Sequence, residues 1–107
     1  MSNDRELLEL AAKAAGYALC NLGEYFYWPT PRGNMSIKQW NPLEDDGDAL
    51  RLAVKLEINI LPSMEECSAR NPGYSASWHN ELATTDPYAA TRRAIVRAAA
   101  EMGRAMP

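Results

Sequence analysis

The sequence predicts an α+β fold: an antiparallel sheet of about four to five strands layered with three helices, in the order α-ββ-α-βββ-α and in the manner of an α-β-α sandwich. Three segments place apolar residues at the 3.6-residue period of a helix. The segments between them alternate at period two or are rich in aromatic and β-branched residues. The length of 107 residues suits a single domain, residues 1–107, with its own core.

The first helix is predicted over residues 4–15. Its leucines and alanines fall within one arc of the helix, and most of its charged residues lie opposite. Asn3 or Asp4 can cap its N-terminus. Gly16 follows at the position where a left-handed C-terminal cap is expected.

A hairpin is predicted next. Residues 25–28 are four consecutive aromatic residues, which indicates a strand, and the Pro- and Gly-containing segment 29–34 indicates the turn. Residues 35–40 alternate in polarity and form the return strand. Four aromatic residues in a row exceed what so small a core buries, so part of this run is expected to face solvent.

Residues 41–48 predict the start of a second helix. Pro42 ends the preceding strand, and carboxylates gather where the positive end of a helix dipole favours them. The helix extends to Leu56 with an apolar arc that includes Leu50 and Val54 and is wide enough to pack against a sheet and a second helix at once. A strand is predicted over 57–62.

Residues 64–70 and 74–82 are predicted to form a second hairpin around the turn at 71–73. The alternation of the second strand places Trp78 and Leu82 on its buried side, together with Tyr74 and Ala76, and His79 on its wet side.

The last helix is predicted to begin at Thr84-Thr85-Asp86-Pro87, because these residues cap a helix and place Pro at its first position. Its predicted inner face consists of Tyr88, Thr91, Ile95, Ala98, Ala99, Met102 and Met106.

Two groups of side chains are candidate binding residues. Arg93, Arg97 and Arg104 share one stripe of the last helix, where they could meet phosphates or an acidic partner. Residues 86–107 carry a net charge of only +2, and the whole chain carries −3. This is less positive charge than binding to nucleic acid normally requires. The alternative is a solvated face with an Arg97–Glu101 pair. The second group is aromatic and is expected at a protein interface: Tyr25, Tyr27 and Trp28.

Catalysis and metal binding find little support. His79 is the one histidine, and Ser75 and Ser77 share its face at strand spacing, but no nucleophile elbow or metal-ligand spacing accompanies it, so we interpret it as a surface histidine. Residues 44–48 are acidic but lack the spacing of a calcium loop, and helix capping explains them. The sequence therefore predicts a protein that is not an enzyme and that uses no metal or cofactor.

The N-terminus lacks the basic and apolar regions of a signal peptide, and no apolar run approaches the roughly 20 residues of a membrane span. Both observations predict a cytoplasmic protein without a membrane partner. Cys20 and Cys67 are accordingly expected as reduced thiols.

Three stretches, 4–16, 40–56 and 86–103, resemble the small proteins of tailed bacteriophages and prophages that are grouped as phage α-β-α sandwich domain proteins. The most specific of them is the run W-N-P-L-E-D-D-G-D-A-L-R-L-A-V, which begins at Trp40. The resemblance implies a sheet layered by helices and an accessory phage protein that acts in the cytoplasm of the infected or lysogenic bacterial host. It implies no reaction, and it transfers no site residues.

Together these observations predict a non-catalytic protein-binding module that modulates a host or phage protein, for example an anti-defence factor. The alternative is a nucleic-acid-associated accessory protein that uses the arginine stripe of the last helix. Self-association as a homo-oligomer is compatible with both.

Overall fold

The computed structural model describes residues 4–23, 25–63, 65–72, 78–82 and 86–107. The elements are α1 (Asp4–Ala15), β1 (Cys20–Leu22), β2 (Tyr25–Pro29), β3 (Met35–Trp40), α2 (Asp46–Leu56), β4 (Asn59–Leu61), β5 (Glu66–Arg70), β6 (Trp78–Leu82) and α3 (Pro87–Arg104). This is the predicted order with one additional strand, β1. Several predicted features lie outside the described residues: the Asn3 cap, Gly73 of the turn, the alternation of 74–77, and Thr84 and Thr85.

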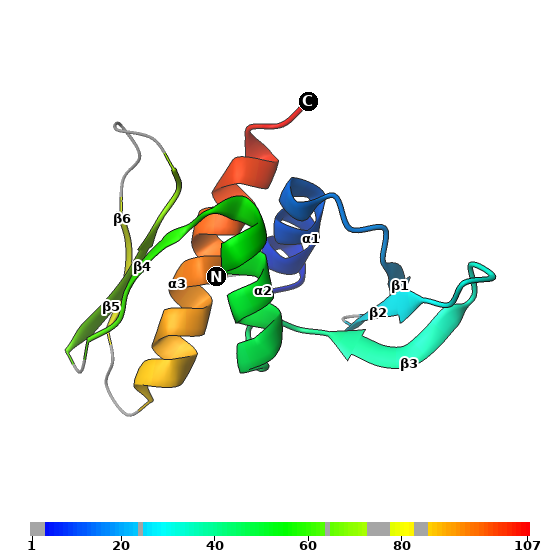
Figure 1. Cartoon of the computed structure of the whole chain (residues 1–107), viewed down its shortest axis with the longest axis horizontal. Coiled ribbons are helices and arrows are strands. Elements are labelled where there is room, and N and C mark those ends of the chain that lie inside the picture. The colour runs from blue at the N-terminus through cyan, green and yellow to red at the C-terminus, as the bar shows by residue number, and fades with distance from the viewer. Residues whose placement is uncertain (1–3, 24, 64, 73–77, 83–85) are drawn as a thin grey trace.

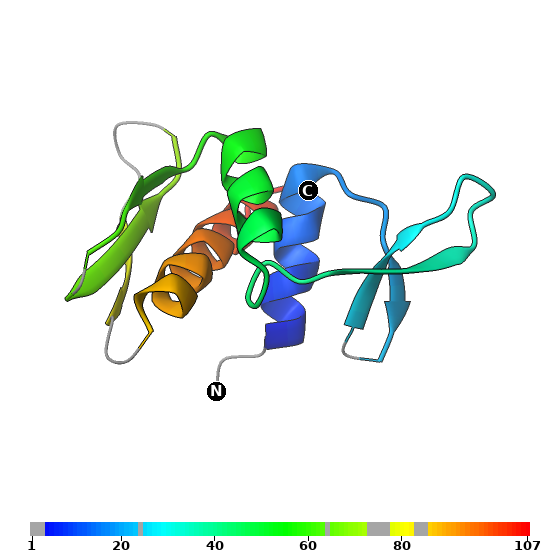
Figure 2. The same cartoon turned by 60° about the horizontal axis from the view of Figure 1, so that its bottom comes forward.

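The strands form two separate antiparallel sheets, and the prediction of one sheet of four to five strands was wrong. Sheet A has the order β1-β2-β3, and sheet B has the order β4-β5-β6. Figures 1 and 2 show the helices between the two sheets. Because α2 separates β3 from β4 along the chain and in space, the two hairpins share no edge. The molecule is elongated as a result, with extents of 43, 32 and 26 Å.

The core is centred on the crossing of α1 and α3, where small side chains let the two helices approach closely. Ala11 and Ala15 of α1 and Ala94 and Ala98 of α3 are buried. Trp40 and Phe26, which are paired across β2 and β3, bring the base of sheet A into the same cluster. Alanine side chains bury little apolar surface. Trp40 and Phe26 therefore contribute much of the buried apolar surface that stabilises this core.

Helix ends follow the predicted chemistry. The Asp86 carboxylate accepts hydrogen bonds from the backbone N–H groups of Tyr88 and Ala89, with Pro87 in the first turn of α3. Gly16 has a φ of 74° directly after α1, as predicted for a left-handed cap. The local signals for helix boundaries were therefore sufficient at these positions.

The second helix buries a narrower stripe than predicted, since Leu50 and Val54 are exposed. Asp48, in the first turn of the same helix, is buried although it is charged. Its carboxylate accepts hydrogen bonds from the Asn41 backbone N–H at 2.9 Å and from the Arg51 guanidinium at 2.8 Å. These two bonds compensate the loss of hydration.

The side assignment of β6 was also wrong. Trp78 and Leu82 are exposed, and His79 and Glu81 are turned toward α3. Inward-facing polar residues are tolerated there because α3 offers partners: Arg97 is bonded to Glu81, and Glu101 is bonded to His79. Helix α3 packs on one face of sheet B, and Leu61 and Leu82 are exposed on that sheet's opposite face, so sheet B is not the middle layer of a sandwich.

The inner face of α3 was predicted correctly in its centre, where Ile95, Ala98 and Ala99 are buried. Two positions of the prediction were wrong. Tyr88 in the first turn is exposed, and the exposed Met106 lies beyond the helix end. Among the described helices, none is long and apolar enough to cross a membrane.

Asp45 is the N-cap of α2, with its carboxylate accepting a hydrogen bond from the Asp48 backbone N–H at 2.7 Å. We expect Asp45→Ala to lower the free energy of unfolding by about 0.5–2 kcal/mol. Asp46→Ala removes an ion pair with Arg92 but no cap, so its effect should be about 1 kcal/mol or less. Urea denaturation of both variants checks the order, and an equal effect would contradict the assignment of the cap.

Candidate interaction surfaces

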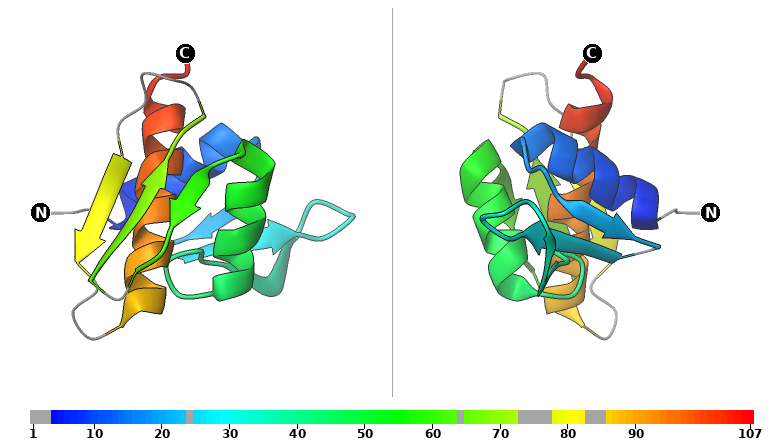
Figure 3. Two further views of the ribbon diagram at one scale, coloured as in Figure 1. Left: turned by 60° about the vertical axis from the view of Figure 1, so that its left-hand side comes forward. Right: turned by 90° about the vertical axis from the view of Figure 1, so that its right-hand side faces the viewer.

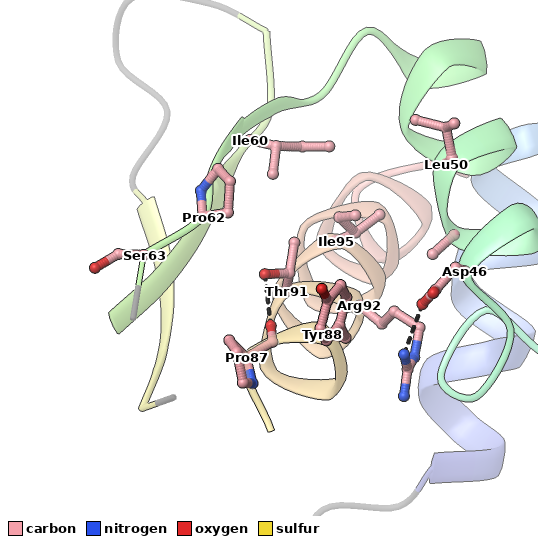
Figure 4. A pocket seen from close by; sticks show the side chains of 11 residues that line it. Asp46, Leu50, Ile60, Pro62, Ser63, Pro87, Tyr88, Thr91, Arg92 and Ile95 are labelled. Carbon is pink, nitrogen blue, oxygen red and sulfur yellow. Dashed lines mark hydrogen bonds and ion pairs between the residues drawn. The ribbon is translucent and has the colours of Figure 1, made fainter. Parts of the chain in front are cut away.

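A groove of about 550 Å³ lies between α2, β4 and the first half of α3 (Figure 4). Leu50 of α2 forms one wall, Ile60 of β4 forms the other, and Ile95 of α3 forms the floor. Its size is that of a pocket for a small molecule or for a few side chains of a partner. The other lining residues are Asp46, Ala49, Pro62, Ser63, Pro87, Tyr88, Thr91 and Arg92.

The side chains of Arg92, Asp46 and Thr91 in the groove are engaged within the chain. Arg92 donates from Nη1 to the Asp46 carboxylate at 2.6 Å and from Nε to the Leu43 carbonyl at 2.9 Å. The Thr91 hydroxyl donates to the Pro87 carbonyl at 2.8 Å, as helical threonines do. These bonds hold the walls in place and leave a lining that is chiefly apolar.

The second surface is on the hairpin of β2 and β3, residues 25–40, which we call the arm. The arm projects from the helices on the side away from sheet B (Figures 2 and 3). On its strand β3 Ile37 is 99% exposed, and Met35 is exposed as well. The pairing of β2 with β3 shifts between Tyr27 and Pro29, so Ile37 lies in an irregular stretch of the strand. The arm thus presents large apolar side chains to solvent.

The predicted aromatic residues divide between the core and the surface. The Trp28 ring packs edge-on against Tyr17, with 4.9 Å between ring centroids, so Trp28 belongs partly to the core. Tyr25 is exposed near the base of the arm, and Tyr27 is half-buried. The expectation that part of this aromatic run faces solvent is confirmed for Tyr25.

Each arginine of the predicted stripe is engaged with a carboxylate. Arg93 is bonded to Asp4 at 3.0 Å, and Arg104 lies 3.6 Å from Glu6, both on α1. Arg97 is bonded to Glu81 of β6. The predicted Arg97–Glu101 pair is replaced by this contact because β6 lies against α3. The stripe therefore joins α3 to its neighbours, and its positive charge is offset locally.

The structure brings two of the six predicted binding residues together. Tyr25 and Arg93 both line a second hollow of about 410 Å³ between the base of sheet A, α1 and α3. Asp4 and Glu44 are also part of its lining, so acidic and basic groups balance there. The remaining candidates, Tyr27, Trp28, Arg97 and Arg104, do not line it.

His79 is largely buried between β6 and α3, which corrects its interpretation as a surface histidine. Its Nε2 lies 3.2 Å from the Glu101 carboxylate. Burial lowers the pKa of His79, the Glu101 carboxylate opposes that change, and the Arg97 guanidinium adds to it. Ser75 and Ser77, its proposed neighbours, lie outside the described residues. His79 thus has a structural position with a carboxylate partner.

This position predicts a pH dependence. Because the folded-state pKa of His79 lies below its unfolded value of 6.5, the unfolded chain binds the proton more readily. The free energy of unfolding should therefore fall as the pH drops from 7 through 6.5 toward the folded-state pKa. His79→Gln should flatten that part of the profile, measured by urea denaturation between about pH 7 and 5. An unchanged slope would contradict the role assigned to burial.

Among the described residues, no set of side chains forms a metal site, and the two cysteines do not lie together. No group of three or more His, Cys, Asp or Glu side chains is placed to hold a metal ion there. Cys20 and Cys67 are free thiols in different sheets. Cys67 is buried, and its Sγ lies 3.2 Å from the Ser63 carbonyl, which the thiol can use as a hydrogen-bond acceptor.

Sequence reasoning placed an interface on the aromatic strand of the arm but missed the groove and the exposed residues of β3, for the same reason. Leu50 and Tyr88 were assigned to buried helix faces, and Met35 and Ile37 were treated as ordinary strand residues. Periodicity identifies apolar faces but does not say whether another element covers them.

In searches for relatives, no family model matches this chain, and neither a curated protein nor a solved structure does.

Proposed function

We propose that this chain is a non-catalytic protein-binding module, an accessory protein of a bacteriophage or prophage that acts on a host or phage protein in the bacterial cytoplasm. The observation that carries the proposal is the exposure of Ile37 together with Met35 on strand β3 of the arm. Large apolar side chains that are exposed close together, as Met35 and Ile37 are on β3, are typical of a surface that another macromolecule covers. The phage origin rests on the resemblance of residues 4–16, 40–56 and 86–103.

The arm suits a protein partner better than a nucleic acid. It contains the exposed Met35 and Ile37 together with Arg32 and Lys38, so exposed apolar side chains are accompanied by positive charge. Binding to nucleic acid depends on a broad basic surface, and the arginines of α3 are held by Asp4, Glu6 and Glu81. A partner with an apolar site and acidic margins fits these features.

Capture from bacterial lysate tests the proposal. Immobilised wild-type protein should retain a specific protein, and Ile37→Asp should lose it, because the substitution buries a carboxylate in the contact. Leu82→Asp is the matched control: Leu82 is also an exposed strand residue, but it lies on the outer face of sheet B. The control should retain the protein at the wild-type level.

Two results would overturn the proposal. One is recovery of no protein above background, or of the same proteins with Ile37→Asp. The other is a band shift of nucleic acid at low salt that Arg93→Ala and Arg97→Ala abolish, since that result would assign the surface of α3 to phosphate binding.

A further inference from the structure

We propose that the arm of one copy of this chain lies in the groove of a second copy, so that two copies exchange arms. This inference rests on the proposed function, since it names a partner for the arm. It pairs the arm with the groove. Three observations support it: the charges of the two surfaces are complementary, the fold keeps the two surfaces of one molecule apart, and each surface is bordered by an edge strand.

The arm is basic. Residues 25–40 contain Arg32 and Lys38 and no Asp or Glu, so the arm carries +2 while the whole chain carries −3. The rest of the chain therefore carries −5. Ile37 and Met35 lie in the same strand as Lys38 and close to Arg32 along the chain. A surface that accepts the arm must combine an apolar floor with acidic margins.

The groove has this composition. Leu50, Ile60 and Ile95 provide apolar walls and floor. Asp46 and Arg92 neutralise each other within the lining. Exposed carboxylates are added nearby by Asp86, which directly precedes Pro87 of the lining, and by Glu65, whose backbone N–H donates to the Ser63 hydroxyl. Two exposed carboxylates thus lie close in sequence to lining residues, one of them as the N-cap of α3, whereas the arm has only positive charges.

The two surfaces of one molecule are kept apart by its own fold. Figures 1 and 2 place α2 between the groove, which borders β4, and the arm. The arm also extends away from the groove. Contact between them is consequently available only between two molecules.

The strands that border these surfaces favour the same contact. In the described residues β3 is one edge of sheet A and β4 is one edge of sheet B. Strand β4 lines the groove through Ile60. An edge strand has unpaired backbone N–H and C=O groups, which a strand from another chain can satisfy. Strand β3 of an inserted arm would bring such groups beside β4.

Exchange in both directions gives a closed dimer. If each arm occupies the groove of the other copy, the two contacts are identical and are related by a two-fold axis, the commonest symmetry of soluble oligomers. Both apolar surfaces are then covered and association stops at two copies, so a bacterial partner of the arm would bind the dissociated form.

The test measures oligomeric state by sedimentation equilibrium of the full chain at concentrations up to about 1 mM, which detects weak association. Wild-type protein should be a dimer. Ile37→Asp removes the most exposed apolar side chain of the arm, and Leu50→Arg places positive charge in the groove. Each variant alone should dissociate at least about tenfold more readily than the wild type. Both positions are exposed, so circular dichroism should show an unchanged fold.

A mixing experiment distinguishes arm exchange from any other dimer. An Ile37→Asp chain keeps an intact groove, and a Leu50→Arg chain keeps an intact arm. Their mixture can therefore form one native contact and should associate more strongly than either variant alone. Val54→Arg and Leu82→Asp are matched controls, since Val54 is 69% exposed one turn from Leu50 but does not line the groove. Both controls should dimerise like the wild type.

A monomeric wild type would overturn arm exchange, as would a dimer that neither variant weakens or a mixture that stays as dissociated as its components. None of these results bears on capture of a bacterial protein by the arm. Failure of the inference and failure of the proposed function can therefore be told apart.

Discussion

Trp40→Ala is expected to lower the free energy of unfolding by about 3–5 kcal/mol, a large part of the stability of a domain of this size. Trp40 is only 1% exposed, and its ring packs edge-on against Tyr17 with 5.7 Å between centroids. Its removal leaves a cavity where the base of the arm meets α1. Its neighbours Tyr17 and Phe26 are rigid rings and many other residues of the core cluster are alanines, so few flexible side chains could fill the space.

Trp78→Ala is the matched control for this substitution. Trp78 is 38% exposed on sheet B, and its ring lies under the Arg70 guanidinium at 4.6 Å. Its loss should cost about 1 kcal/mol or less. Urea denaturation followed by circular dichroism measures both variants. Equal effects of the two substitutions would contradict the position of Trp40 in the core.

Gly103→Ala is the second substitution with a large expected effect. A Cβ added at Gly103 would lie 2.0 Å from the backbone carbonyl oxygen of Leu10, so α1 and α3 would have to separate. Overpacking of this kind typically costs about 1–3 kcal/mol, although alanine by itself favours a helix by about 1 kcal/mol over glycine. We therefore expect a net loss of stability and a lower Tm.

Gly47→Ala serves as its control, because Gly47 is also helical but has different neighbours. An added Cβ there would lie 3.1 Å from the nitrogens at the far end of the Arg51 side chain and 3.2 Å from the Asp45 carboxylate, contacts that shifts of a few tenths of an ångström relieve. This variant should be close to the wild type in stability. A Gly103→Ala protein as stable as the Gly47→Ala protein would contradict the close approach of the two helices.

The helices were largely predictable because their signals are local. Asp86 and Pro87 mark the start of α3, Gly16 adopts its left-handed cap, and the boundaries of α1 agree with the prediction. Capping depends on hydrogen bonds within a few residues, and the sequence contains both partners. The strands of both hairpins were found for a related reason, since period two and turn residues are properties of short segments.

The faces were less predictable, because a face is buried only when another element lies on it. His79 and Glu81 point inward on β6 because Glu101 and Arg97 of α3 are there to meet them. Those partners are 16 or more positions away in the sequence. The same applies to Leu50, whose apolar side chain lines an open groove instead of a closed core.

The sequence by itself determined the number, type and order of most elements of this protein, together with its helix caps. The tertiary structure decided that the strands form two sheets separated by helices, and which apolar residues remain uncovered. The physical reason is the range of the interactions. Turns, caps and periodicity act over a few residues, whereas burial depends on which surfaces meet after the chain has folded. The exposed arm and the groove are therefore properties of the assembled fold.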